Sequence, residues 1–187
     1  MRRNVWAALL WVLLLCACSI SVASPRPVPP EVTDTPLAVA TTAVPGPQNC
    51  GYQWANQDLP ALSHSFQASI QALQPQAQAN AYAFGENCIL ADGSVGGFSA
   101  METDFNVTLQ VNDLTNESDL GEWIVKVMQV IERVPRDQIA GPQPGRVSIT
   151  FHSSSDQKVI NFYINQYQGL SAGLSNAEIY RSLQVPQ

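Results

Sequence analysis

Alternation of apolar and polar residues predicts four β-strands in this chain. It is clearest between Met101 and Val111, where every second residue except Thr103 is apolar and the residues between them are polar. Shorter stretches with the same period cover residues 147–152 and 160–165, and residues 79–88 form a further candidate strand. A period of two places alternate side chains on opposite faces of a sheet. One face is therefore expected to be buried and the other to be in contact with water.

Turn residues group these strands into two pairs. Asp92 and Gly93 predict a tight turn between the first two strands, and residues 154–157 predict a turn between the last two. Each pair is therefore expected to form an antiparallel hairpin.

Three other stretches have the spacing of amphipathic helices. Residues 59–74 and 116–134 carry apolar side chains at intervals of three and four residues, and a proline directly follows each stretch. The third helix is expected to start at Ser175, where Glu178 completes the spacing of a capping box, and to end near Leu183.

The predicted order is helix, two strands, helix, two strands, helix (α-β-β-α-β-β-α). Strands and helices that are each apolar on one side bury those sides when they pack against one another. The sequence therefore predicts an α+β fold with a four-stranded antiparallel sheet and the helices on one of its faces. A chain of 187 residues has room for one such globular domain, which we expect over residues 50–187.

The N-terminus has the features of an export signal. Arg2 and Arg3 precede an apolar run from Val5 to Leu15, which is the order of the charged and apolar regions in a signal peptide. The run is shorter than the roughly 20 residues that a membrane-spanning helix needs.

The residues at the end of this run, Leu15-Cys16-Ala17-Cys18, resemble the lipobox of bacterial lipoproteins. The resemblance implies that residues 1–17 are removed as a signal peptide and that Cys18 receives a diacylglyceryl group. The mature protein would then stay attached, through its lipid, to a membrane of the bacterial cell envelope. An ordinary cleavage after Ser21-Val22-Ala23 is the alternative, and it would release a soluble protein.

Residues 18–49 are expected to form a tether. This segment is rich in Pro, Ser, Thr, Val and Ala, and its prolines oppose a regular helix or a central strand. Cys50 directly follows the tether, and Cys88 is the other cysteine of the expected domain. In an oxidising compartment the two should form a disulfide, whereas two unpaired buried thiols are the alternative.

The charge of the chain argues against nucleic acid as a partner. The chain has a formal net charge of −6, and its nine lysines and arginines are spread along the sequence. Binding to a phosphate backbone needs a basic patch or stripe, so nucleic acid is not expected as a partner. The sequence also lacks a phosphate-binding loop, a dinucleotide fingerprint and a zinc-site spacing. No cofactor is therefore expected.

The polar face of the predicted sheet carries the candidate functional residues. Glu102, Asp104 and His152 offer oxygen and imidazole ligands for a divalent metal if neighbouring strands bring them together. Thr150 and Tyr163 add hydrogen-bonding groups to the same face. Carboxylates on a solvated strand face are also explained by solubility alone, so the pattern does not assign a metal site.

These features favour a membrane-tethered extracytoplasmic lipoprotein that does not catalyse a reaction. Its polar sheet face is then the candidate surface for binding an envelope protein or a glycan, through Glu102, Asp104, Thr150, His152 and Tyr163. The alternative is an envelope enzyme or a divalent-metal-dependent protein that uses the same face.

Overall fold

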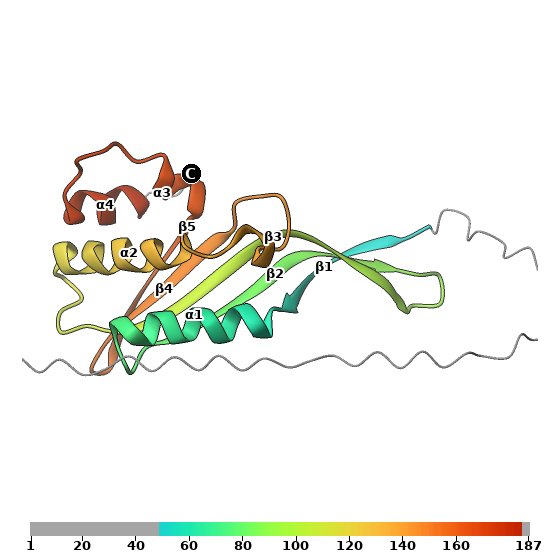
Figure 1. Ribbon diagram of the computed structural model, residues 1–187, viewed down its shortest axis with the longest axis horizontal. Coiled ribbons are helices and arrows are strands. Elements are labelled where there is room, and N and C mark those ends of the chain that lie inside the picture. The colour runs from blue at the N-terminus through green and yellow to red at the C-terminus, as the bar shows by residue number, and fades with distance from the viewer. Residues whose placement is uncertain (1–48, 185–187) are drawn as a thin grey trace, which may run out of the picture. The chain divides into compact units, whose positions relative to one another are not determined.

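The computed structural model describes residues 49–184, which belong to one compact unit. The predicted signal peptide, Cys18 and all of the predicted tether except Asn49 lie outside the described residues. The described part has an α+β fold, as predicted (Figure 1). Its elements are β1 (Gly51–Asp58), α1 (Pro60–Leu73), β2 (Gln78–Ile89), β3 (Val95–Gln110), α2 (Glu117–Ile131), a 3₁₀ turn (Arg136–Gln138), β4 (Arg146–Ser153), β5 (Asp156–Tyr163), α3 (Ile164–Gln168) and α4 (Asn176–Leu183).

The sheet has five strands in the order β1-β2-β3-β4-β5, so the prediction of four antiparallel strands is wrong in two respects. There is one strand more, and β3 pairs with β4 in parallel while the other neighbours are antiparallel. The parallel pair results from α2, a helix of 15 residues. A helix of this length carries the chain back by about 22 Å, so β4 begins at the same end of the sheet as β3.

The additional strand is β1, which forms an edge of the sheet and pairs with Tyr82 to Ile89 of β2. Its sequence, GYQWANQD, has no alternation of apolar and polar residues, and every residue except Ala55 is exposed. The pattern that predicts half-buried strands is therefore missing. Cys50 directly precedes β1 and is bonded to Cys88 of β2, which confirms the predicted disulfide.

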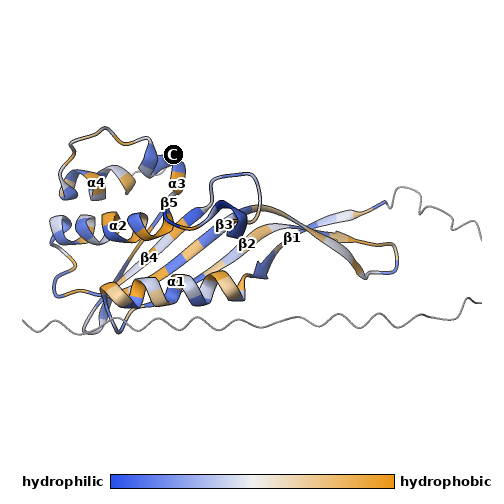
Figure 2. Cartoon of the chain, in the orientation of Figure 1, coloured by the Kyte–Doolittle hydropathy of each residue, from blue (hydrophilic) through white to orange (hydrophobic). Residues whose placement is uncertain are grey.

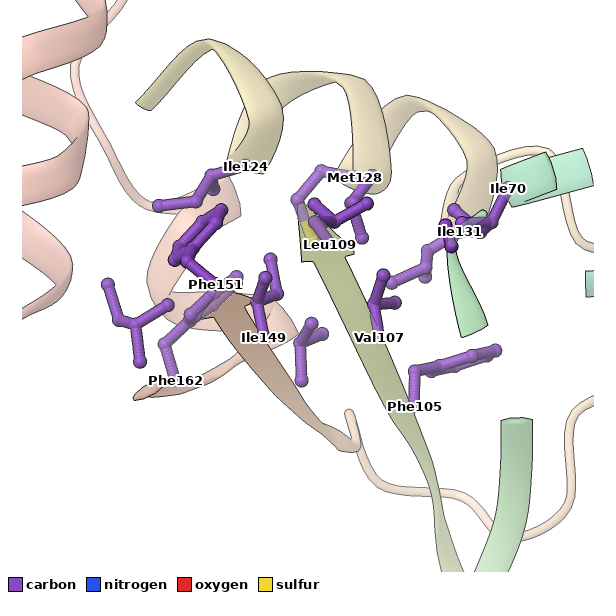
Figure 3. Close-up of a cluster of buried hydrophobic side chains, with 14 of the residues drawn as sticks. Ile70, Phe105, Val107, Leu109, Ile124, Met128, Ile131, Ile149, Phe151 and Phe162 are labelled. Carbon is purple, nitrogen blue, oxygen red and sulfur yellow. The ribbon is translucent and has the colours of Figure 1, made fainter. Parts of the chain in front are cut away.

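The core lies between the helices and one face of the sheet. Phe105 of β3 is completely buried and packs edge to face against Phe66 of α1, with ring centroids 5.0 Å apart. Figure 3 shows Ile124 and Met128 of α2 among the apolar side chains of β3, β4 and β5. Hydrophobic and hydrophilic residues alternate along β3 and β4 (Figure 2), so the predicted two-sided pattern is present.

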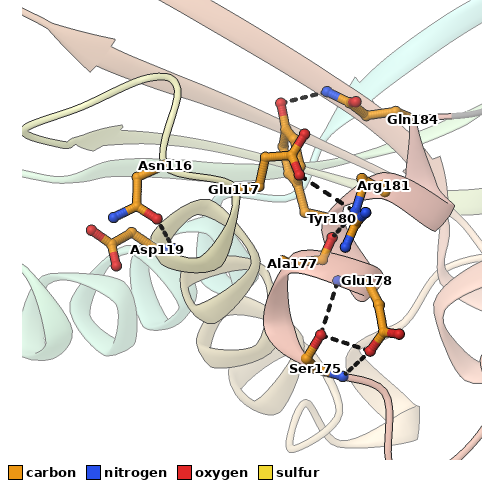
Figure 4. Close-up of polar contacts among 9 residues, drawn as sticks. All are labelled: Asn116, Glu117, Asp119, Ser175, Ala177, Glu178, Tyr180, Arg181 and Gln184. Carbon is orange, nitrogen blue, oxygen red and sulfur yellow. Dashed lines mark hydrogen bonds and ion pairs between the residues drawn. The ribbon is translucent and has the colours of Figure 1, made fainter.

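The last helix packs mainly against α2. Glu117 of α2 forms an ion pair of 3.4 Å with Arg181 of α4 (Figure 4). Both helices have N-caps. Asn116 accepts a hydrogen bond from the Asp119 amide, and Ser175 forms the expected capping box with Glu178. These caps satisfy amides that a helix leaves without intrahelical partners.

Three strand segments extend past the helices and form what we call the arm. It consists of residues 51–57 of β1, residues 84–89 of β2 and residues 95–100 of β3 (Figure 1). A register shift follows the first residue of the arm on β2, between Phe84 and Gly85. The Cys50–Cys88 disulfide joins two of its three strands.

Candidate functional site

The strand register places all five predicted site residues on one face of the sheet, which we call the open face. Directly paired residues share a face, and Phe105, Val107 and Leu109 point into the core. The residues that alternate with them, and their partners on β4 and β5, therefore belong to the open face. These include Glu102, Asp104, Thr150, His152 and Tyr163.

The same register separates the proposed metal ligands. His152 pairs with Gln110, which is six residues along β3 from Asp104. Six residues of a strand span about 20 Å, so His152 cannot share a metal ion with Asp104. Among residues 49–184, no group of three or more His, Cys, Asp or Glu side chains lies close enough to hold a metal ion.

Two of the predicted residues form a buried carboxyl pair. Glu102 is 8% exposed and Asp104 is 3% exposed, although both lie on the open face. The backbone amide of Arg146 donates a hydrogen bond of 2.7 Å to Asp104, and the guanidinium of Arg146 is 3.8 Å from the other oxygen of this carboxylate. Asp104 is thus held by one residue of β4 through both its backbone and its side chain.

Arg146 connects this pair to a neighbouring aromatic residue. Its pKa is raised above the ordinary value, chiefly by a hydrogen bond with the Tyr82 side chain and also by the charge of Asp104. Tyr82 is the direct partner of Asp104 across β2 and β3. Arg146 therefore interacts with two groups on the open face, the Asp104 carboxylate and the Tyr82 side chain.

Burial raises the pKa of Glu102 above its ordinary value, and the nearby charge of Asp104 raises it further. Arg146 opposes this shift only in part. A carboxyl group with a raised pKa stabilises the folded protein in its protonated form. This contribution is complete below the pKa of the unfolded chain and is lost as the pH rises through the folded-state pKa.

We therefore expect Glu102→Gln to stabilise the protein at neutral pH and to have little effect at acidic pH. Glutamine has almost the same shape as glutamic acid but cannot ionise, so the variant avoids burying a charge. Melting temperatures of both proteins should be compared at neutral pH and about one pH unit below 4.5, the ordinary pKa of the residue. An equal difference at the two pH values would contradict a raised pKa.

A loop before β4 lies along β3 beside Glu102. The backbone amide of Gln143 donates a hydrogen bond of 3.0 Å to the backbone carbonyl of Met101, and Gln143 forms an isolated β-bridge with Glu102. The Thr103 hydroxyl is hydrogen-bonded to the backbone of Ala140. Residues that precede β4 in the chain thus continue the contact with β3.

A glycine makes this close approach feasible. A Cβ on Gly145 would lie 1.7 Å from the Thr103 carbonyl oxygen. Real Cβ atoms do not approach so closely, so any larger residue would push the loop away from β3. The sequence alone gives no sign of the strand that this glycine touches.

A pocket of 580 Å³ opens next to Glu102. Its wall comes from the loop, from the end of β5 and from α3 and the residues that follow. The lining combines one carboxyl group, three side-chain amides, one phenol and two apolar residues. It consists of Glu102, Gln143, Pro144, Tyr163, Asn165, Gln166, Gly169 and Leu170.

Aromatic residues of the arm continue the site on its other side. Trp54 stacks on Phe84 with ring centroids 5.3 Å apart and an interplanar angle of 13°. Trp54 is nevertheless 60% exposed, and the nearby Tyr52 is 70% exposed. Phe84 pairs directly with Glu102, so the stack and the pocket share the open face.

Sequence reasoning does not find this aromatic stack. Trp54 belongs to β1, which the alternation pattern does not reveal, and its neighbour Phe84 is 30 residues away in the chain. Only the pairing of β1 with β2 brings the two rings together.

No helix among residues 49–184 is long and apolar enough to cross a membrane. Comparison of the chain with protein-family models, with curated proteins and with solved structures finds no match.

Proposed function

We propose that this protein is a bacterial lipoprotein that is tethered to a membrane of the cell envelope and binds an envelope component through its open face. Cys18 carries the lipid, and residues 18–49 space the domain from the membrane. The domain itself acts by binding and not by catalysis.

The observation that carries the binding role is the exposure of Trp54 on a sheet face that also holds a buried carboxyl pair and a pocket. Exposed aromatic residues and buried ionisable groups both carry a free-energy cost, and both are typical of binding sites. The helices α1, α2 and α4 contribute their apolar residues to the opposite side of the sheet. These three helices therefore do not cover the polar and aromatic open face.

The anchor is supported by the order of features along the chain. The charged and apolar regions of a signal lead to the lipobox-like residues, and a proline-rich segment separates Cys18 from the first strand. The Cys50–Cys88 disulfide fits an extracytoplasmic location, because disulfides persist in oxidising compartments.

Photocrosslinking in intact cells tests the binding role. A photoreactive amino acid placed at Thr150 or Tyr163 should give crosslinked products, because both residues lie on the open face. The same amino acid at Gln129, an exposed residue of α2 on the helical side, is the matched control. Equal crosslinking from the three positions would contradict a binding surface on the open face.

A further inference from the structure

Phe84, on which Trp54 stacks, and Glu102, which lines the pocket, belong to one continuous row of positions across the strands. Asn56 pairs with Phe84, Phe84 pairs with Glu102, and Glu102 is bridged to Gln143. Neighbouring strands lie about 4.8 Å apart, so these four positions span about 14 Å. Tyr163 and the other pocket residues extend the row further. We call this set of positions the cross-strand row.

Near one end of the cross-strand row, at Phe84, the stacked ring of Trp54 is exposed to solvent. Phe84 supports one face of the Trp54 ring, since the two rings are stacked nearly in parallel at 5.3 Å. Trp54 remains 60% exposed despite this contact. A supported and exposed aromatic ring offers a flat, rigid surface that loses little entropy on binding. The C–H face of a pyranose ring is a flat apolar surface of complementary shape.

The other end of the row presents uncharged groups that both donate and accept hydrogen bonds. Side-chain amides, such as those of Gln143 and Asn165, have two donors and one acceptor oxygen, and the Tyr163 hydroxyl both donates and accepts. Glu102 adds a carboxyl group with a raised pKa, which donates when protonated and accepts when ionised. This combination matches the hydroxyl groups of a sugar, which also donate and accept.

The charged side chains near the row favour a neutral sugar over an anionic one. Among residues 49–184, no lysine, arginine or histidine lines the pocket, and Arg146 forms an ion pair with Asp104 and a hydrogen bond with Tyr82. Glu86 is the direct cross-strand partner of Trp54, so the aromatic end also carries a carboxyl group. Within the described part of the chain, an anionic ligand would meet the carboxyl groups of Glu102 and Glu86 along the row, and no lysine, arginine or histidine of the pocket lining would pair with it. A neutral ligand meets no such repulsion.

We propose that the cross-strand row binds a neutral oligosaccharide, with one sugar ring stacked on Trp54 and the next rings hydrogen-bonded in the pocket beside Glu102. This inference rests on the proposed binding role of the open face and names the class of ligand. Aromatic stacking positions the chain of sugars, and the amides of Gln143 and Asn165 select its hydroxyl pattern.

Tryptophan fluorescence provides the test. Two of the four tryptophans, Trp6 and Trp11, lie in the predicted signal peptide, which leaves Trp54 and Trp123 in the mature protein. In a Trp123→Phe background Trp54 is the only reporter. The probes are tetrasaccharides of glucose (β-1,4 and α-1,4), mannose and N-acetylglucosamine, with tetralysine as a charged peptide. At least one tetrasaccharide should shift the Trp54 emission in a saturable way.

The matched variant is Trp54→Ala, followed by calorimetry because the reporter is lost. Its affinity for the active sugar should fall at least about tenfold, whereas Trp123→Phe should bind as the wild type does. Trp54 is largely exposed, so circular dichroism should show an unchanged fold. Gln143→Ala at the pocket end should also weaken binding, which a role of Trp54 alone would not predict.

Three results would overturn the inference. They are the absence of binding by every tetrasaccharide at concentrations up to about 10 mM, unchanged affinity in Trp54→Ala, and binding of tetralysine alone. Crosslinking from Thr150 and Tyr163 shows whether only the sugar proposal is wrong or whether the proposed binding role of the open face is wrong as well. If those positions still crosslink specifically while no sugar binds, the open face binds a partner that is not a neutral glycan.

Discussion

Replacing Cys18 with alanine should abolish incorporation of radiolabelled palmitate into this protein. Lipid attachment at a lipobox requires the thiol of its cysteine, and alanine offers no atom for that bond. The wild-type protein should carry the label and partition into the detergent phase after extraction with a detergent that separates on warming. Labelling of Cys18→Ala should fall to background.

Cys16→Ala is the matched control for the anchor. It removes a cysteine two residues away within the same predicted signal and should leave palmitate labelling intact. Label that persists in Cys18→Ala, or that disappears equally in Cys16→Ala, would show that Cys18 is not the lipid-bearing residue.

Truncation of Phe105 to alanine should lower the free energy of unfolding by about 3–5 kcal/mol. The side chain is completely buried and packs against Phe66 of α1. Its loss would leave a cavity between α1 and the centre of the sheet, where neighbouring side chains can relax only in part. Urea unfolding followed by circular dichroism, with the disulfide intact, measures the difference.

Phe98→Ala is the control for this truncation. It removes the same atoms from β3, but Phe98 lies in the arm and is only partly buried. We expect a loss well below that of Phe105→Ala, because less apolar surface returns to water. Equal losses from the two variants would mean that the arm is packed as tightly as the helix-covered core.

The elements with regular periodicity can be predicted from this sequence. The alternation that starts at Met101 lies within β3 up to its last residue, Gln110, and the capping residues Asn116 and Ser175 mark the starts of α2 and α4. Local patterns determine these features, because each depends on residues only a few positions apart. The parallel pairing of β3 with β4 is different, since two hairpins of the same sequence pattern can meet in more than one order.

The candidate site is predictable only where it depends on alternation. Thr150 and Tyr163 lie on the open face because their apolar neighbours point into the core. The burial of Glu102 and Asp104 cannot be inferred in this way, because it depends on Arg146 and on the loop that lies beside β3. The position of Trp54 depends on an edge strand whose residues are almost all exposed.

Cysteine labelling in intact cells tests most directly the claim that the open face is a binding surface. Asn161→Cys introduces an exposed thiol on β5, and Gln129→Cys introduces one on α2. Cys50 and Cys88 are bonded to each other and do not compete for a maleimide. Each labelling rate is measured in cells and again on the purified protein. We predict that the thiol at position 161 reacts more slowly in cells while the thiol at position 129 does not, whereas equal rates in both settings at both positions would contradict the account.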